Sequence, residues 1–289
     1  MKAKKSLGQH FLKSPGIISD IVKAGNVQKD DLVLEIGPGK GALTEALLST
    51  GAKVIAVEKD DELVLELQRK FSREISLKQL NLVHADILDL ELPHLAMSRM
   101  PLDTDITTTP YKIVANIPYY ITGQILRMFL ESDNQPTSMT LLMQKEVAER
   151  IVAKPSLRSS VARSVKSGFR AKDQKESLLS LSVKIFGEPK IVRVVGRGAF
   201  SPQPNVDSAV LNIENISRVR LDGVSEKIFF NIIHLGFAHK RKQLLPNLTS
   251  LFKKEILVKA FEKCGVNLKA RAEDLSLETW LKLCNTIGL

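Results

Sequence analysis

Short runs of apolar, often β-branched residues alternate along much of the chain with longer segments whose apolar positions recur at helical spacing. From Asp31 to about Ile213 this alternation predicts an α/β domain, because such segments pack as a mostly parallel sheet covered by helices. Helices are expected between the strands, for example at Gly41–Thr50 and Glu62–Phe71. The expected strands are Leu32–Ile36, Lys53–Glu58, Leu80–His84, Tyr111–Ala115, Ser138–Gln144, Ile191–Val195 and Ser208–Ile213.

The alternation stops at a polar break, Asn215–Gly223, beyond which Val224–Leu289 shows amphipathic helical spacing and no strand signal. We therefore expect a sheet domain at residues 1–216 and a smaller all-helical domain at residues 217–289.

Two stretches are irregular. Leu92–Pro110 contains three prolines and a threonine-rich patch, which indicates a surface loop, and Lys154–Glu176 is basic and suits a flexible loop or a short helix.

Composition narrows the class of protein. Apolar residues make up 44% of the chain, yet no apolar run is long enough to cross a bilayer. Met1–Lys5 leads into Ser6 and Gly8 instead of the apolar core of a signal peptide, so we expect a cytoplasmic protein. Cys264 and Cys284 have no histidine at a metal-ligand spacing, which favours buried free thiols over a disulfide or a metal site.

The net charge of +10 is distributed unevenly. Residues 1–153 carry 18 basic and 20 acidic side chains, whereas residues 154–289 carry 24 and 12. An excess confined to one part of the chain suits a polyanion bound through phosphate contacts, although many basic surfaces serve only solubility. Charge alone therefore leaves nucleic-acid binding and a solvated basic surface equally open.

Polar and glycine residues at the ends of three successive predicted strands indicate a nucleoside-containing cofactor. Gly37, Gly39 and Gly41 form a turn where the lack of Cβ atoms lets a ligand approach the backbone, although their spacing departs from the dinucleotide-binding pattern. Glu58 ends the next strand and can accept ribose hydroxyls, and Asp86, after the third, can accept an adenine amino group. Together with the motif below, they favour S-adenosylmethionine over a nicotinamide cofactor.

The fourth of these strands leads into a segment suited to methylating an amine, Asn116-Ile117-Pro118-Tyr119-Tyr120. The N6 amine of adenine is a poor nucleophile because its lone pair is delocalised into the ring. The Asn116 side-chain oxygen and the Pro118 carbonyl can each accept a hydrogen bond from that amine and draw the nitrogen toward tetrahedral geometry. Tyr119 can stack on a base turned out of its helix or loop. An ordinary turn is the alternative.

Six motifs in order make the chain resemble the KsgA-type ribosomal RNA adenine dimethyltransferases over nearly its whole length. They are Leu7-Gly8-Gln9-His10-Phe11-Leu12, Glu35-Ile36-Gly37-Pro38-Gly39, Asn116-Ile117-Pro118-Tyr119, Gln144-Lys145-Glu146-Val147, Phe200-Ser201-Pro202-Gln203-Pro204-Asn205-Val206-Asp207-Ser208-Ala209-Val210 and Arg271-Ala272-Glu273-Asp274-Leu275-Ser276. The resemblance implies a Rossmann-like S-adenosylmethionine-dependent methyltransferase sheet followed by a helical domain. It also implies dimethylation of two adjacent adenines in the hairpin loop near the 3′ end of small-subunit rRNA, within an assembling subunit. We expect the enzyme to be a monomer.

The resemblance extends the expected site. It implies that His10, Leu12 and Asn116 also contact the cofactor, with His10 at a position that is often Asn in the family. Phe200 is expected to pack on the target base opposite Tyr119, unless it is a core residue. Phe237–Leu244 resembles the family's basic helix segment, which contributes to RNA engagement, unless it is only a solvated run of charges.

One stretch departs from the family, because roughly twenty extra residues separate Lys154 from Ser177.

Two alternatives to the small-subunit enzyme stay open. One is the related antibiotic-resistance methyltransferase group that modifies large-subunit RNA. The other is an assembly checkpoint or transcription factor that has kept the fold and lost catalysis, which the intact Asn116, Pro118, Tyr119, Glu58 and Asp86 argue against.

Overall fold

A computed structural model describes residues 8–90, 109–153, 175–239 and 241–287. Its contacts group the chain into two compact units, Met1–Ala148 with Gly187–Ser217, and Glu149–Phe186 with Arg218–Leu289. The second boundary falls beside the expected division after residue 216. The segment Glu149–Phe186 groups with the helical unit, whereas the alternation of strands and helices predicts that it belongs to the sheet domain. Most of the irregular segments 92–110 and 154–176 lies outside the described residues.

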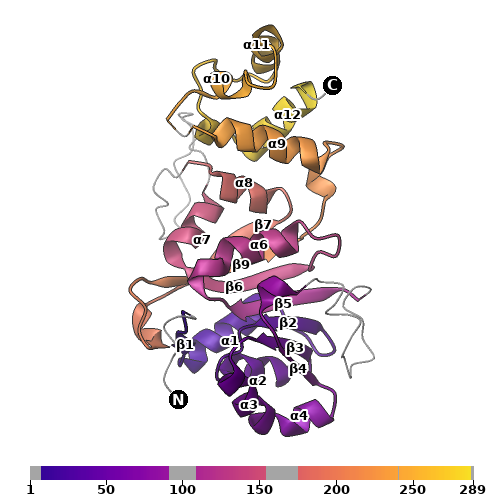
Figure 1. Cartoon of the computed structure of the whole chain (residues 1–289), viewed down its shortest axis with the longest axis vertical. Coiled ribbons are helices and arrows are strands. Elements are labelled where there is room, and N and C mark those ends of the chain that lie inside the picture. The colour runs from indigo at the N-terminus through magenta and orange to yellow at the C-terminus, as the bar shows by residue number, and fades with distance from the viewer. Residues whose placement is uncertain (1–7, 91–108, 154–174, 240, 288–289) are drawn as a thin grey trace, which may run out of the picture. The chain divides into compact units, whose positions relative to one another are not determined.

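The first unit is built on a seven-stranded sheet with the order β4-β3-β2-β5-β6-β9-β7 (Figure 1). Strands β4 to β6 are parallel, and β9 is antiparallel to both of its neighbours. The strands are β2 Leu32–Ile36, β3 Lys53–Glu58, β4 Leu80–His84, β5 Tyr111–Asn116, β6 Ser138–Gln144, β7 Glu188–Val195 and β9 Ser208–Glu214. The expected mostly parallel sheet is thereby confirmed.

Six α-helices belong wholly or partly to the described residues of the first unit. They are α1 Pro15–Ala24, α2 Ala42–Leu48, α3 Asp61–Lys70, α4 Ser72–Ser76 and α6 Thr122–Leu130, and α7 Lys145–Val152 runs across the unit boundary. Helix α3 shows why these bounds arise. The side chain of Asp60 accepts a hydrogen bond from the Glu62 backbone at 3.1 Å, which satisfies a free amide of the first turn. Acidic residues begin this helix and Arg69 and Lys70 end it, as its dipole favours.

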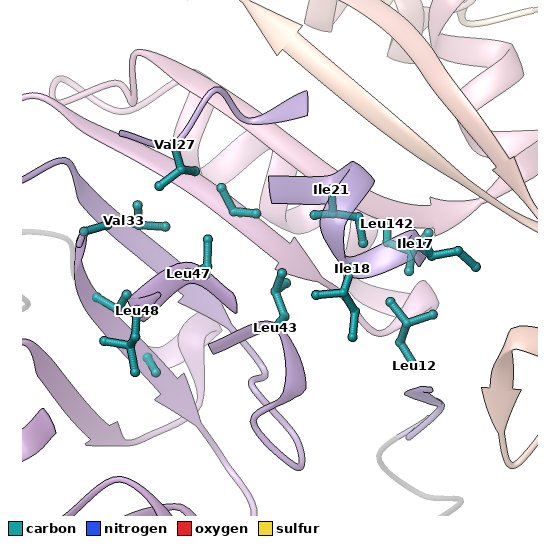
Figure 2. Close-up of a cluster of buried hydrophobic side chains, with 14 of the residues drawn as sticks. Leu12, Ile17, Ile18, Ile21, Val27, Val33, Leu43, Leu47, Leu48 and Leu142 are labelled. Carbon is teal, nitrogen blue, oxygen red and sulfur yellow. The ribbon is translucent and has the colours of Figure 1, made fainter. Parts of the chain in front are cut away.

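Helices α1 and α2 cover one face of the sheet with a buried hydrophobic cluster (Figure 2). Alternate strand residues, such as Val33 on β2 and Leu142 on β6, point into this cluster. The other residues of β2 are buried as well, which is the pattern of a parallel strand covered on both faces. The carboxyl ends of the central strands are therefore held rigidly at one edge of the sheet.

A two-stranded sheet that the sequence did not predict joins the amino-terminal segment to a distant loop. Strand β1, Phe11–Leu12, pairs antiparallel with β8, Phe200–Ser201. Two-residue strands carry no periodic signal, so only tertiary pairing can define them.

The second unit contains α8 Leu178–Lys184, α9 Glu226–Phe237, α10 Leu244–Leu248, α11 Lys254–Lys263 and α12 Leu277–Ile287. The expectation of helices beyond Val224 is thus confirmed over the described residues. The described residues of the basic segment after Phe237 are not helical, because α9 ends at Phe237 and His239, Arg241 and Lys242 lie in the turn before α10. Among the described residues, we find no helix that combines the length and apolarity needed to span a membrane.

Candidate active site

A cleft with an empty volume of about 1080 Å³ opens at the carboxyl ends of β2 to β5 in the first unit. The chain leaves β2 toward β3 on one side and returns to β5 on the other, and such a switch in strand order is where α/β sheets bind ligands. Five stretches contribute lining residues, within residues 8–18, 35–43, 57–63, 85–87 and 116–121.

The glycine turn after β2 forms a cradle at one side of the cleft. Gly37, Gly39 and Gly41 have φ values of 67°, 59° and 73°, in the left-handed region that favours glycine. The Gly37 amide donates to the Val57 carbonyl at 2.9 Å, which ties the turn to β3. A Cβ added at Gly37 would meet no protein atom within 4 Å, so it would project into open space at the cleft.

Main-chain amides hold the Glu58 carboxylate beside this cradle. Gly39 donates to Oε2 at 3.1 Å, and Lys59 and Asp60 each donate to Oε1 at 2.9 Å. Burial raises the pKa of Glu58, and these hydrogen bonds oppose the shift because they stabilise the charged form. The carboxylate is thereby fixed in one orientation in the cleft wall, at the position expected to accept ribose hydroxyls.

Asp86 lies in the same wall and already has two partners. Its Oδ1 accepts from the Leu88 amide at 3.0 Å, and its Oδ2 pairs with Lys59 Nζ at 2.5 Å. Burial alone would raise the pKa of Asp86, but the hydrogen bond from Lys59, the Leu88 amide and the lysine charge together lower it. Asp86 is therefore an ionised acceptor that a bound adenine amine would share with Lys59.

The amino-terminal segment is tied across the cleft at several points. Gln9 Nε2 donates to Asp60 Oδ2 at 2.8 Å, and His10 Nδ1 donates to the Pro202 carbonyl at 2.8 Å. A Cβ at Gly39 would lie 3.1 Å from the Phe11 ring, so the glycine turn packs directly against this segment. These ties place His10 and Leu12 among the residues that line the cleft.

Asn116, at the end of β5, is oriented by that same segment. Its Nδ2 donates to the His10 carbonyl at 3.2 Å. Because the amide nitrogen is used in this way, the side-chain oxygen is left as the acceptor group. Pro118 follows, and its carbonyl accepts from the Ile121 amide at 3.2 Å while keeping a second lone pair. Two oxygen acceptors thus belong to one short stretch of the cleft wall.

The two predicted aromatic residues differ in their surroundings. The Tyr119 ring stacks on His10 with centroids 5.8 Å apart, and its hydroxyl is 2.6 Å from Ser208 Oγ. Phe200 is 4% exposed, pairs with Leu12 through β8, and belongs to the buried hydrophobic cluster. Of the nine predicted site residues, all but Phe200 are found among the described residues that line the cleft.

Sequence reasoning missed three residues of the cleft. Lys59 pairs with Asp86, which the sequence could not reveal because 27 residues separate them. Glu35 lines the cleft and is 1% exposed, and burial raises its pKa to about 8. Tyr120 also lines the cleft, although the motif that it follows indicates no role for it. Its position beside Tyr119 was the available signal.

The sheet order and this cleft define an S-adenosylmethionine-dependent methyltransferase. The glycine cradle, the fixed Glu58 carboxylate and the Asp86 acceptor fit the adenosine part of that cofactor. Over residues 1–288 the chain matches the family described as ribosomal RNA adenine dimethylase. It belongs to this family, and is accordingly an S-adenosylmethionine-dependent rRNA adenine dimethyltransferase.

Individual relatives agree with this assignment. The ribosomal RNA small subunit methyltransferase A of Dehalococcoides mccartyi (strain CBDB1) is 41% identical over 286 residues, which cover 98% of this chain and 88% of that protein. The crystal structure of the 23S rRNA methyltransferase ErmE is 25% identical with a TM-score of 0.70, covering 96% of this chain and 100% of that one. A dimethyladenosine transferase from Plasmodium falciparum, 24% identical, shares the fold with a TM-score of 0.72, over 95% and 96% of the two chains.

Proposed function

We propose that the enzyme dimethylates N6 of two adjacent adenines in the hairpin loop near the 3′ end of small-subunit rRNA. We further propose that it acts as a cytoplasmic monomer on an assembling subunit. The observation that carries the catalytic part is the orientation of Asn116, whose amide nitrogen is bound to the His10 carbonyl. That bond leaves the side-chain oxygen to receive an adenine amine.

In this mechanism the two oxygen acceptors act on the substrate amine. Asn116 Oδ1 and the Pro118 carbonyl each accept one N–H of the amine, which localises the nitrogen lone pair and aims it. S-adenosylmethionine, when bound, supplies an electrophilic methyl group. The nitrogen carries a positive charge after the transfer and then releases a proton to water, so no ionised general base is required at the start.

In the second transfer the substrate is an amine that already carries one methyl group. The monomethylated nitrogen retains one N–H and can donate to only one of the two acceptors. The other acceptor must then lie beside the first methyl group, so the site has to tolerate a methyl where the first round placed a hydrogen bond. Two neighbouring acceptors allow the remaining N–H to be held in either orientation, which supports dimethylation over a single transfer.

The aromatic residues have different proposed roles. Tyr119, with its ring on His10 and its hydroxyl at Ser208, is rigid enough to form one wall for the target base. Phe200 supports the site indirectly, since its burial and pairing place Leu12 in the cleft wall. We therefore assign the direct contact with the base to Tyr119.

The small subunit is favoured over the large one by sequence. The relative that is 41% identical is named for the small subunit, whereas the large-subunit enzyme ErmE is 25% identical. The basic second part of the chain supports binding through phosphates, with His239, Arg241 and Lys242 in the turn before α10 as candidate contacts. Most of the basic stretch 154–176 lies outside the described residues.

The decisive experiment incubates the protein and labelled S-adenosylmethionine with unmethylated small subunits, large subunits and naked rRNA, and then maps each modified nucleotide. We expect dimethyladenine at two neighbouring positions of the small-subunit hairpin. Methylation confined to large subunits would refute the proposed substrate and favour the resistance-type alternative. Tight binding to small subunits without any transfer would instead favour the checkpoint alternative.

A further inference from the structure

We propose that Tyr120 forms a second nucleobase subsite at the mouth of the cleft, where its ring stacks on an unpaired base that flanks the target adenine. The inference rests on the proposed function insofar as the substrate is a single-stranded stretch of rRNA. Base stacking on aromatic side chains is a general means of holding single strands.

Exposure distinguishes Tyr120 from the other aromatic residues. Its side chain is 64% exposed and lines the cleft. The other exposed large apolar side chains among the described residues are aliphatic. A stacked base would remove this apolar ring surface from water, and the ring lies in the cleft next to Pro118 and Tyr119, the residues proposed to contact the target base.

The local backbone presents this ring rigidly. Tyr120 is the middle residue of the 3₁₀ turn Tyr119–Ile121, which Pro118 begins and in which Ile121 is buried. Gly8 packs against the ring, because a Cβ added at Gly8 would lie 3.4 Å from both Cδ1 and Cε1. A ring supported by a glycine and otherwise exposed loses little conformational freedom when a base stacks on it.

Tyr119 is less suited to a flanking base. Its ring already stacks on His10, and its hydroxyl is bound to Ser208. The two consecutive tyrosines therefore have different roles. Tyr119 contacts the target base in the reaction site, and Tyr120 stacks on the flanking base outside it. In an enzyme that modifies two adjacent adenines, such a platform can hold one adenine by stacking while its neighbour reacts.

The test compares Tyr120→Leu, which keeps an apolar side chain without a ring, with Tyr120→Phe and Tyr120→Trp, which keep the ring. Leu77→Ala is the matched control, since Leu77 is also 64% exposed but follows α4 away from the cleft. Single-turnover methylation is measured against the concentration of unmethylated small subunits. Binding is followed with a hairpin RNA carrying 2-aminopurine next to the target adenine, and calorimetry gives the S-adenosylmethionine affinity.

We expect Tyr120→Leu to raise the half-saturating RNA concentration roughly 5- to 150-fold and to abolish quenching of 2-aminopurine. The Phe and Trp variants should restore both, and cofactor affinity should stay unchanged. RNA dependence and quenching equal to wild type in Tyr120→Leu, or a loss confined to cofactor affinity, would overturn the subsite. If wild type methylates large subunits instead, the proposed substrate fails separately, and the same variants are compared on that RNA with the same criteria.

Discussion

Replacement of Asn116 tests two roles of its side chain, the proposed acceptance of the substrate amine and the donation to the His10 carbonyl. In Asn116→Ala the proposed acceptor for the substrate amine is lost, together with the donor to the His10 carbonyl. Loss of one preorganised contact of this kind costs about 10²- to 10³-fold in rate, or about 2.7–4 kcal/mol of transition-state stabilisation. We therefore expect the single-turnover rate to fall by at least about 100-fold.

Cofactor affinity should change far less in this variant. The amino-terminal segment keeps its 2.8 Å bonds from Gln9 to Asp60 and from His10 to Pro202, as well as the β1–β8 pairing. Removing one neutral hydrogen bond costs about 0.5–1.5 kcal/mol, which is at most roughly a tenfold loss of affinity. Binding of small subunits should remain close to wild type, because the basic excess lies elsewhere in the chain.

Asn116→Asp provides the complementary variant. The carboxylate keeps an oxygen for the amine, but it presents a second oxygen to the His10 carbonyl where the amide donated. We expect this repulsion to weaken cofactor binding more than in Asn116→Ala, while the rate at saturating cofactor falls less. Rapid-quench assays with calorimetry measure both quantities. An Asn116→Ala rate within tenfold of wild type would refute the reasoning.

Three further predictions concern other residues. Glu58→Ala removes a fixed, charged acceptor, so S-adenosylmethionine affinity should fall by about 1.5–3 kcal/mol in calorimetry, with RNA binding kept; an unchanged affinity would contradict this role. Gly236→Ala should lower the free energy of unfolding measured in urea, because the added Cβ would lie 2.5 Å from Trp280. Overpacking of this kind costs about 1–3 kcal/mol, whereas the higher helix propensity of alanine contributes about 1 kcal/mol. A variant more stable than wild type would disprove this prediction. Burial raises the pKa of Glu35 from 4.5 to about 8, so the folded state retains a proton that the unfolded chain releases, and stability falls as pH rises through that window. Glu35→Gln should consequently gain stability relative to wild type between pH 5 and pH 8, and a constant difference would argue against the shift.

Most of the sheet was predictable from the sequence, because strands buried on both faces appear there as short runs of apolar residues. The expected bounds of β2, β3, β4 and β6 agree with the structure residue for residue. Strands β2, β3 and β6 are buried over nearly their whole length, which is the pattern of strands covered on both faces, whereas the edge strand β4 is buried only at Leu80 and Asn81. The end of each strand then located the glycine turn, Glu58 and Asp86 without any coordinates.

Other features left no such record. The grouping of Glu149–Phe186 with the helical unit depends on contacts such as the pairing of Lys175 with Glu273 and the hydrogen bond from the Glu176 amide to the Glu273 carbonyl. Phe200 resembled a base-contacting residue by motif, but the pairing of β8 with β1 buries it. Burial of a single side chain depends on which distant segment covers it, so local periodicity cannot predict it.

The sequence by itself determined the class of chemistry, since the residue types and their order at successive strand ends specify what a crevice at that edge can bind. Only the tertiary structure decided how those groups are used. It placed the His10 carbonyl against the Asn116 amide, Lys59 on Asp86, and Gly8 behind the Tyr120 ring. Each of these contacts joins groups from separate elements of the chain. Orientation of a side chain is set by such partners across space, and the order of residues along the chain does not record them.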